Sequence, residues 1–213
     1  MRRTVLIIIL LFCGTSCSKY VITNRCHHIV QKNYSKPDKI VVKDAIICAD
    51  AGAVFNKTIE VNKDSVFDLL LNSLQKLPIN IERKNGNRYC NSQFVKNSKL
   101  KFRRFNFQEL NSLIGNEEGD FLIPVINIQF VTFRNMYVTS TGAIGNGGFT
   151  KGINLQLAIL IFRNDKLIYF KSRVFISDSV TDDNSHQSTN PIQRENWDKL
   201  VYLVMEDYIK RIK

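Results

Sequence analysis

Residues 153–177 read INLQLAILIFRNDKLIYFKSRVFIS, and this stretch decides the fold. Both halves are rich in β-branched, aromatic and other apolar residues, which is typical of strands that face a core. Asn164-Asp165 separates the halves and is a two-residue turn signal, because Asn and Asp tolerate the left-handed backbone of tight hairpins. The stretch therefore predicts an antiparallel hairpin in which residues 153–163 pair with residues 166–177.

The neighbouring segments extend this sheet. Residues 121–139 alternate apolar and polar positions and predict a long strand, in which Pro124 marks an edge or a bulge because proline lacks an N–H. Residues 140–152 (STGAIGNGGFTKG) lack the spacing of a phosphate-binding loop and predict a flexible hairpin loop that could still be a contact site. Residues 193–212 place apolar side chains on one face and charges on the other, which predicts a closing amphipathic helix.

The upstream half supplies shorter elements. We expect strands over residues 39–48, 54–61 and 79–83, a helix over residues 64–77 capped by Asp64-Ser65, and a short helix over residues 106–114. This order of elements predicts an α+β fold, a mostly antiparallel sheet with helices packed on one face.

The N-terminus carries an export signal. Arg2 and Arg3 precede an apolar run over residues 5–12, and Gly14, Thr15 and Ser16 follow it. A positive start, a short apolar core and small residues at a cleavage site define a secretory signal peptide. The run is far shorter than the roughly 18 residues that span a bilayer. We therefore expect residues 1–16 to be a removable signal peptide.

Cys17 directly follows the small residue Ser16 and resembles the lipobox cysteine of bacterial lipoproteins, which is lipidated and becomes the mature N-terminus. Gly14 departs from that pattern, because leucine is usual there. Ordinary cleavage also favours small residues at positions 14 and 16 and would give a soluble secreted protein. We predict lipidation of Cys17, a flexible tether over residues 17–38 and one α+β domain over residues 39–213.

The charge balance favours anionic partners. The chain has 30 basic and 19 acidic residues, a net charge of +11, which falls to +9 when Arg2 and Arg3 leave with the signal. We expect the partners to be a membrane, through the anchor, and another cell-envelope protein or an anionic envelope polymer; export argues against nucleic acid. Residues 87–105 interleave cations with phenylalanines, and we interpret them as core-facing aromatics with solvated cations, a pattern that also suits anionic lipid.

Metal and cofactor sites are not indicated. Three cysteines remain beyond Cys17, namely Cys26, Cys48 and Cys90, and they leave open one disulfide with a free thiol or three thiols. No two of these three cysteines have the spacing of zinc ligands. His27-His28 and the group Asp178, Asp182 and Asp183 are better interpreted as solvated polar residues than as metal ligands.

Catalytic residues are not indicated either. His186 lies in a polar segment without a nucleophile pattern around it. The alternative is an exported glycan-acting hydrolase with paired carboxylates, for which the candidates are Glu109, Glu117, Glu118 and Asp120. These four lie close together in the sequence and are typical of a solvated turn, so we expect no enzyme activity.

The element order, the tether and the lipobox resemble small bacterial envelope lipoproteins. Their domain is similar to the curli-secretion lipoprotein, to the activator lipoproteins of penicillin-binding proteins and to the N-terminal domain of the translocation protein TolB. The resemblance rests on residues 119–123 (GDFLI) leading from a helix into a strand, on the hairpin and on the closing helix, and it spans roughly residues 53–213. It is architectural and transfers no functional residue.

This resemblance implies a protein-binding or assembly role. We therefore predict an exported, lipid-anchored, non-catalytic interaction module of the bacterial cell envelope, placed at the outer membrane and facing the periplasm or the cell surface. The alternatives are a soluble secreted binding domain and the hydrolase.

Overall fold

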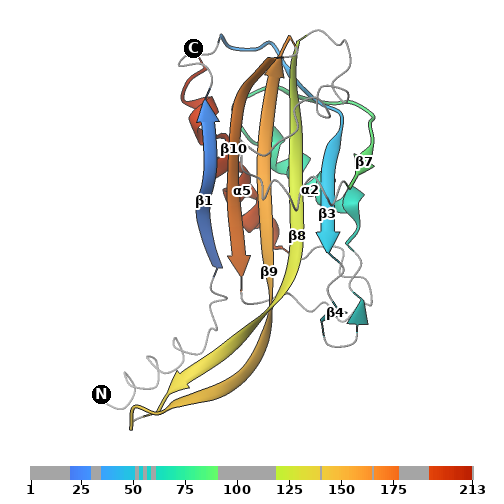
Figure 1. The fold of residues 1–213 in the computed structure, drawn as a ribbon. Coiled ribbons are helices and arrows are strands. Elements are labelled where there is room, and N and C mark those ends of the chain that lie inside the picture. The colour runs from blue at the N-terminus through green and yellow to red at the C-terminus, as the bar shows by residue number, and fades with distance from the viewer. Residues whose placement is uncertain are drawn as a thin grey trace, which may run out of the picture.

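The computed structural model describes residues 20–29, 35–50, 53–54, 57–58, 61–90, 119–139, 141–164, 166–177 and 192–212. They form a mixed, mostly antiparallel sheet with two helices on one face (Figure 1), which confirms the predicted α+β class. The main path of the sheet is β1 (Tyr20–Ile29), β10 (Lys166–Ser177), β9 (Ile144–Arg163), β8 (Asp120–Val138), β2 (Ile40–Val42) and β6 (Ile81–Arg83).

Long antiparallel ladders join β1, β10, β9 and β8, whereas the short strands beyond β8 pair in parallel. Strand β3 (Ala45–Asp50) also pairs in parallel with β8 and with β7 (Arg88–Tyr89). The segment expected as one strand over residues 54–61 instead contributes β4 (Ala53–Val54) and β5 (Lys57–Thr58), which pair with each other. The expected helix over residues 106–114 lies outside the described residues.

The predicted hairpin is present. Strand β9 pairs with β10 from Ile153↔Ser177 to Arg163↔Lys166, and Asn164 adopts the left-handed backbone with a φ of 47°. The glycine-rich segment differs from its predicted loop, because β9 already begins at Ile144 and pairs with β8. An antiparallel ladder satisfies the backbone groups of glycines as well as those of other residues. Of the expected loop over residues 140–152, only residues 141–143 lie outside a strand in the described part of the chain.

The strand expected over residues 39–48 is interrupted at Lys43-Asp44. Strand β2 pairs with Asp120 and Phe121 of β8, and β3 resumes the pairing at Val125. Pro124 lies in the gap between these two ladders, inside the sheet and not at the predicted edge or bulge. The gap accommodates a residue that lacks an N–H donor. The break gives the chain a kink that other side chains must hold.

Strand β1 occupies part of the expected tether. It pairs with β10 along its length, with one register shift between Asn24 and Cys26. Ile22 packs partly buried against the core, and the free edge of β10 supplies backbone partners for this segment. Sequence pattern alone does not reveal that edge, because β10 lies about 150 residues further along the chain.

Two helices cover one face of the sheet. Helix α2 (Lys63–Gln75) begins after Asn62, whose side chain accepts a hydrogen bond from Ser65 N at 3.1 Å, so the cap lies just before the predicted Asp64-Ser65. Helix α5 (Arg194–Ile209) agrees with the predicted closing helix. Asp198 of α5 accepts hydrogen bonds from Ser73 of α2, at 2.7 Å, and from Lys76, the C-cap residue of α2, and these bonds join the two helices.

The core is divided by the sheet. The larger cluster lies under the helices and includes Phe67, Tyr169, Trp197 and Tyr208, all fully buried. A second buried cluster on the opposite face, with Ile123, Leu160 and Phe170 among its members, contains no residue of α2 or α5. The two described helices therefore pack on one face, as predicted.

Candidate functional site

The end of the sheet where β1 begins is the part of the fold that bears on the predicted anchor. Cys17 itself lies outside the described residues, but only Ser18 and Lys19 separate it from the first residue of β1. Tyr20 pairs with Ser177, Ser177 with Ile153, and Ile153 with Phe130. These residues form one row across four strands, and the row defines the N-terminal end of the sheet.

Beyond this row only β8 and β9 continue, as a two-stranded arm over residues 131–152. Its ladder runs from Val131↔Gly152 to Val138↔Ile144, with one register shift between Arg134 and Met136. None of the other described strands pairs with it. Figure 1 shows the arm extending past the start of β1, away from the rest of the sheet.

The tip of the arm is an ordered turn. Thr139 N donates to Ala143 O at 2.8 Å, Gly142 N donates to Thr139 O at 2.9 Å, and Ala143 N donates to Thr139 Oγ1 at 3.0 Å. Gly142 has a φ of 80°, a conformation that favours glycine. The turn presents Ile144 to solvent with 71% of its surface exposed.

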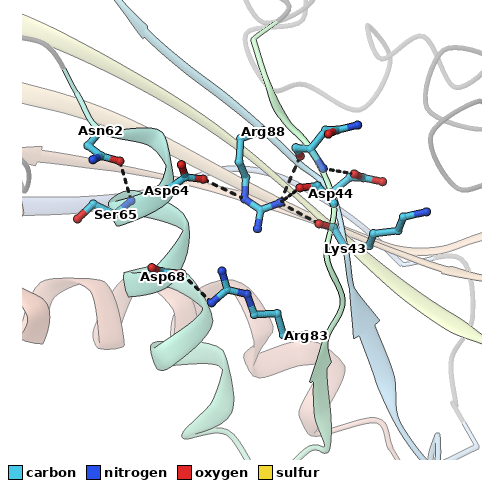
Figure 2. A network of polar contacts seen from close by, with 10 residues as sticks. Lys43, Asp44, Asn62, Asp64, Ser65, Asp68, Arg83 and Arg88 are labelled. Carbon is cyan, nitrogen blue, oxygen red and sulfur yellow. Dashed lines mark hydrogen bonds and ion pairs between the residues drawn. The ribbon is translucent and has the colours of Figure 1, made fainter.

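A second cluster of polar contacts holds the kink between β2 and β3 (Figure 2). Arg88 donates from Nη1 to Lys43 O at 2.9 Å and to Gly86 O at 3.1 Å, and its Cζ lies 3.4 Å from the centroid of the Phe67 ring. The buried carboxylate of Asp44 accepts a hydrogen bond from Asn87 N at 2.7 Å. Arg88 therefore joins the kink to helix α2 through backbone carbonyls and a cation–π contact.

The charges around Arg88 balance within the cluster. Burial lowers the pKa of Arg88 below its ordinary value, and the nearby carboxylate of Asp64, 4.0 Å from Nε, opposes that shift. Arg83 pairs with Asp68 at 2.9 Å on the same side of α2. Because guanidinium and carboxylate groups here face one another, the cluster stabilises the fold and offers no nucleophile next to a base.

Gly86 gives the first prediction. A Cβ at this position would lie 2.3 Å from Lys43 O and 2.6 Å from Asp44 Oδ1, and the backbone oxygen cannot rotate away. We expect Gly86→Ala to lower the free energy of unfolding by about 1–3 kcal/mol, the usual cost of overpacking, as measured by urea denaturation. The exposed neighbour Asn85 provides the control, Asn85→Ala, and equal stabilities of the two variants would contradict the crowding argument.

A group of carboxamides lies on the sheet face opposite the helices. Asn127 pairs across the ladder with Gln156, and Gln129 pairs with Asn154. Asn127 is buried, and the side-chain oxygens of Asn154 and Gln156 are buried without a hydrogen-bond partner. The sequence pattern predicted polar residues at 127 and 129, but their burial and cross-strand pairing depend on register.

Of the residues considered for catalysis or metal binding, Asp120, His27 and His28 lie in the described part of the chain. Asp120 is buried on β8 and forms a double ion pair with Arg163 of β9, at 2.7 Å to Nε and 2.6 Å to Nη2. Arg163 also donates to Ser35 Oγ at 2.6 Å. His27 and His28 lie in β1, and the other residues considered lie outside the described residues, namely Glu109, Glu117, Glu118, Asp178, Asp182, Asp183 and His186.

Cys48 and Cys90 form a disulfide, which settles one of the alternatives that the sequence left open. Cys48 is buried in β3, and Cys90 follows β7, the parallel partner of β3. The bond therefore fastens the chain leaving β7 to the sheet. Cys26 lies in β1 and takes no part in this pair.

The described residues were compared with the requirements of a metal site and of a membrane-spanning helix. Within the described ranges, no three His, Cys, Asp or Glu side chains are close enough to form a metal site. No helix in these same ranges combines the length and hydrophobicity needed to cross a membrane.

Comparison with known proteins shows structural similarity alone. No protein family matches the sequence, and no curated protein is similar to it. The PelC dodecamer from Paraburkholderia phytofirmans aligns with 92% of this chain and 99% of its own, at 8% identity and a TM-score of 0.36. A neuraminyllactose-binding hemagglutinin homologue from Helicobacter pylori aligns with 88% of this chain and 90% of its own, at 9% identity and a TM-score of 0.37.

These similarities cover most of the chain at very low identity, and no argument about activity or partners follows from them. The resemblance to the curli-secretion, activator and TolB domains stays a prediction. The chain is thus structurally similar to the two proteins above over most of its length, without membership of a family being shown.

Proposed function

We propose that the chain is an exported, non-catalytic protein of the bacterial cell envelope, anchored to the outer membrane by a lipid on Cys17, which acts as an interaction or assembly module. The observation that carries this proposal is the N-terminal sequence. It combines Arg2-Arg3, an apolar run over residues 5–12, and a small residue directly before Cys17. No other part of the chain carries so specific a signal.

The disulfide supports export. Structural disulfides form and persist mainly in oxidising compartments such as the bacterial periplasm and are rare in the cytosol. Cys48 and Cys90 are bonded across the β3–β7 region. A chain that folds after export can form this bond, so the signal sequence and the disulfide point to the same compartment.

The placement of β1 defines how close the anchor holds the domain. In a chain beginning at Cys17, only Ser18 and Lys19 precede the strand. An extended chain rises at most about 3.5 Å per residue, so the path from Cys17 to Tyr20 spans about 10 Å. The proposed anchor therefore holds the N-terminal end of the sheet next to the membrane surface.

The role of Asp120 favours a non-catalytic function over a hydrolase. Its two carboxylate oxygens are both engaged by Arg163. A general acid in a glycosidase must reach the leaving-group oxygen of the substrate, whereas both oxygens of Asp120 already accept hydrogen bonds from the Arg163 guanidinium. Asp120 is the described member of the four carboxylates considered for a hydrolase, and it is better explained as part of a structural ion pair.

The partner we propose is an anionic envelope polymer or another envelope protein. The mature chain would carry 28 basic and 19 acidic residues, a net charge of +9. Such an excess attracts polyanions and raises association rates with acidic surfaces. It requires no cofactor and no metal.

The anchor is tested by expressing the full chain and a Cys17→Ala variant in a bacterial host. We expect the wild-type product to start at Cys17, to carry the mass of a diacylglycerol and to partition into membranes. The variant should lose both the added mass and the partition. Intact-mass spectrometry and membrane fractionation measure these outcomes.

An unmodified soluble product from both chains would contradict the anchor. That result would leave the soluble secreted binding domain as the better interpretation. Retention of the wild-type chain in the cytoplasm with residues 1–16 intact would contradict export as a whole.

A further inference from the structure

We propose that the two-stranded arm over residues 131–152 is a second membrane contact, with its tip touching the phospholipid surface that holds Cys17. This inference rests on the proposed lipid anchor. It concerns a different part of the chain, one that the anchor alone does not require to touch lipid.

The arm leaves the sheet at the end where β1 begins. The row Tyr20, Ser177, Ile153 and Phe130 places the start of β1 and the base of the arm at the same end of the sheet. Residue 131 follows Phe130 directly, so the arm leaves the sheet where the anchored N-terminus enters it. Figure 1 shows the arm continuing past the start of β1 on this side.

The arm is longer than the spacer between Cys17 and β1. The chain between Cys17 and Tyr20 reaches about 10 Å when fully extended. The arm pairs from Val131↔Gly152 to Val138↔Ile144, and at a rise of about 3.3 Å per residue it extends about 25 Å beyond the row. Because the arm is longer than the spacer and leaves the same end, the anchor brings it to the membrane surface.

The charged residues of the arm are all basic. Residues 131–152 contain no Asp or Glu, and their charged residues are Arg134 and Lys151. A segment with this composition is not repelled by anionic head groups and is attracted by about 1 kcal/mol for each cation near the surface. The whole stretch between Asp120 and Asp165 lacks acidic residues, and the arm is the part of it that projects from the sheet.

The tip of the arm exposes an apolar side chain. Ile144 is 71% exposed, and Tyr202, at 48%, is the other exposed large hydrophobic residue among those whose side chains the structure describes. The turn before it carries only small uncharged residues, Thr139, Thr141, Gly142 and Ala143 among them, and its hydrogen bonds fix how Ile144 is presented. An exposed apolar side chain on an ordered, uncharged turn suits the boundary between head groups and acyl chains.

Tryptophan fluorescence tests the contact in the full chain. The native chain has one tryptophan, Trp197, which is fully buried, so a tryptophan added at the tip gives a separable signal. We would purify the lipidated wild type, Ile144→Trp and Tyr202→Trp in detergent. Each would be reconstituted into vesicles of phosphatidylethanolamine and phosphatidylglycerol with plain or brominated acyl chains.

We expect brominated lipid to quench the emission added by Ile144→Trp about twofold, because bromine quenches only at contact with the acyl region. The control Tyr202→Trp places a ring on α5 at the other exposed hydrophobic position, which is 48% exposed, and its emission should be unaffected. Mass spectrometry of the same samples reports the lipid on Cys17.

The possible outcomes separate the two proposals. Lipidated, vesicle-bound protein without quenching of Ile144→Trp would overturn the membrane contact and leave the anchor intact. An unmodified Cys17 would overturn the anchor and the contact together. A blue shift of Ile144→Trp that depends on protein concentration and appears without vesicles would assign the arm to a second copy of the chain, which also overturns the membrane contact.

Discussion

Replacing both disulfide cysteines, as Cys48→Ala with Cys90→Ala, is expected to lower the free energy of unfolding by about 4 kcal/mol. The bond closes a loop with a sequence separation of 42 residues. Loop-closure entropy in the unfolded chain sets this magnitude, and it is a large part of the roughly 5–15 kcal/mol that stabilises a typical domain. Urea denaturation of the mature chain under oxidising conditions measures it.

The controls for this prediction come from the same chain. Cys26→Ser removes a cysteine that lies outside the pair and should change the stability little. Adding a thiol reductant to the wild type should lower its stability to that of the double variant, and the double variant should not respond. In unfolded protein that has not been reduced, the thiols of Cys48 and Cys90 should not react with a thiol reagent. Reaction of both would show that the bond does not form.

The disulfide also bears on export. If the chain folds in an oxidising compartment, the double variant should reach a lower level than the wild type in the periplasm of a bacterial host, because proteases remove unfolded protein. The same variant and the wild type should accumulate equally in a reducing cytosol when the signal over residues 1–16 is deleted. This comparison connects a stability difference to the compartment proposed for the protein.

Local sequence pattern was sufficient for the elements whose packing follows from their own periodicity. The hairpin around Asn164 combines two apolar runs with a two-residue turn signal, and the closing helix α5 has a helical period; both occur where predicted. Helix α2 begins one or two residues before its expected start, because Asn62 provides the cap. These features need no information from distant parts of the chain.

The elements that differ from prediction depend on distant partners. Strand β1 forms because β10 offers a free edge, although residues 18–38 look polar and irregular. The glycine-rich segment becomes β9 because β8 continues alongside it as a strand of 19 residues. The break at Lys43-Asp44 is held by Arg88, more than forty positions away, and no local signal marks it.

The same reason limits what could be predicted of the candidate sites. Asp120 lies close in sequence to Glu117 and Glu118 and was therefore considered with them as a carboxylate group. Its partner in the structure is Arg163, which lies directly opposite on β9. The register of two long strands determines that pair, and composition or spacing cannot show it.

Asp120→Ala is the second change expected to have a large effect, a loss of about 3 kcal/mol in the free energy of unfolding. The side chain of Asp120 is 5% exposed and that of Arg163 is 23% exposed, so removing the carboxylate leaves a largely buried guanidinium with fewer partners. Replacing both, as Asp120→Leu with Arg163→Met, should recover much of the loss, since a well-packed apolar pair can substitute for a buried ion pair. Urea denaturation of the single and double variants measures the coupling.

The exposed pair Lys39–Glu82, at 2.5 Å, is the matched control. Glu82→Ala should cost much less than Asp120→Ala, because solvent screens that pair. The sign of the Asp120 effect also distinguishes the two functional interpretations. Catalytic carboxylates are often held in sites that cost stability, so their removal tends to be neutral or stabilising. A clear loss on Asp120→Ala would identify this residue as part of the fold, whereas a gain in stability would favour the hydrolase alternative.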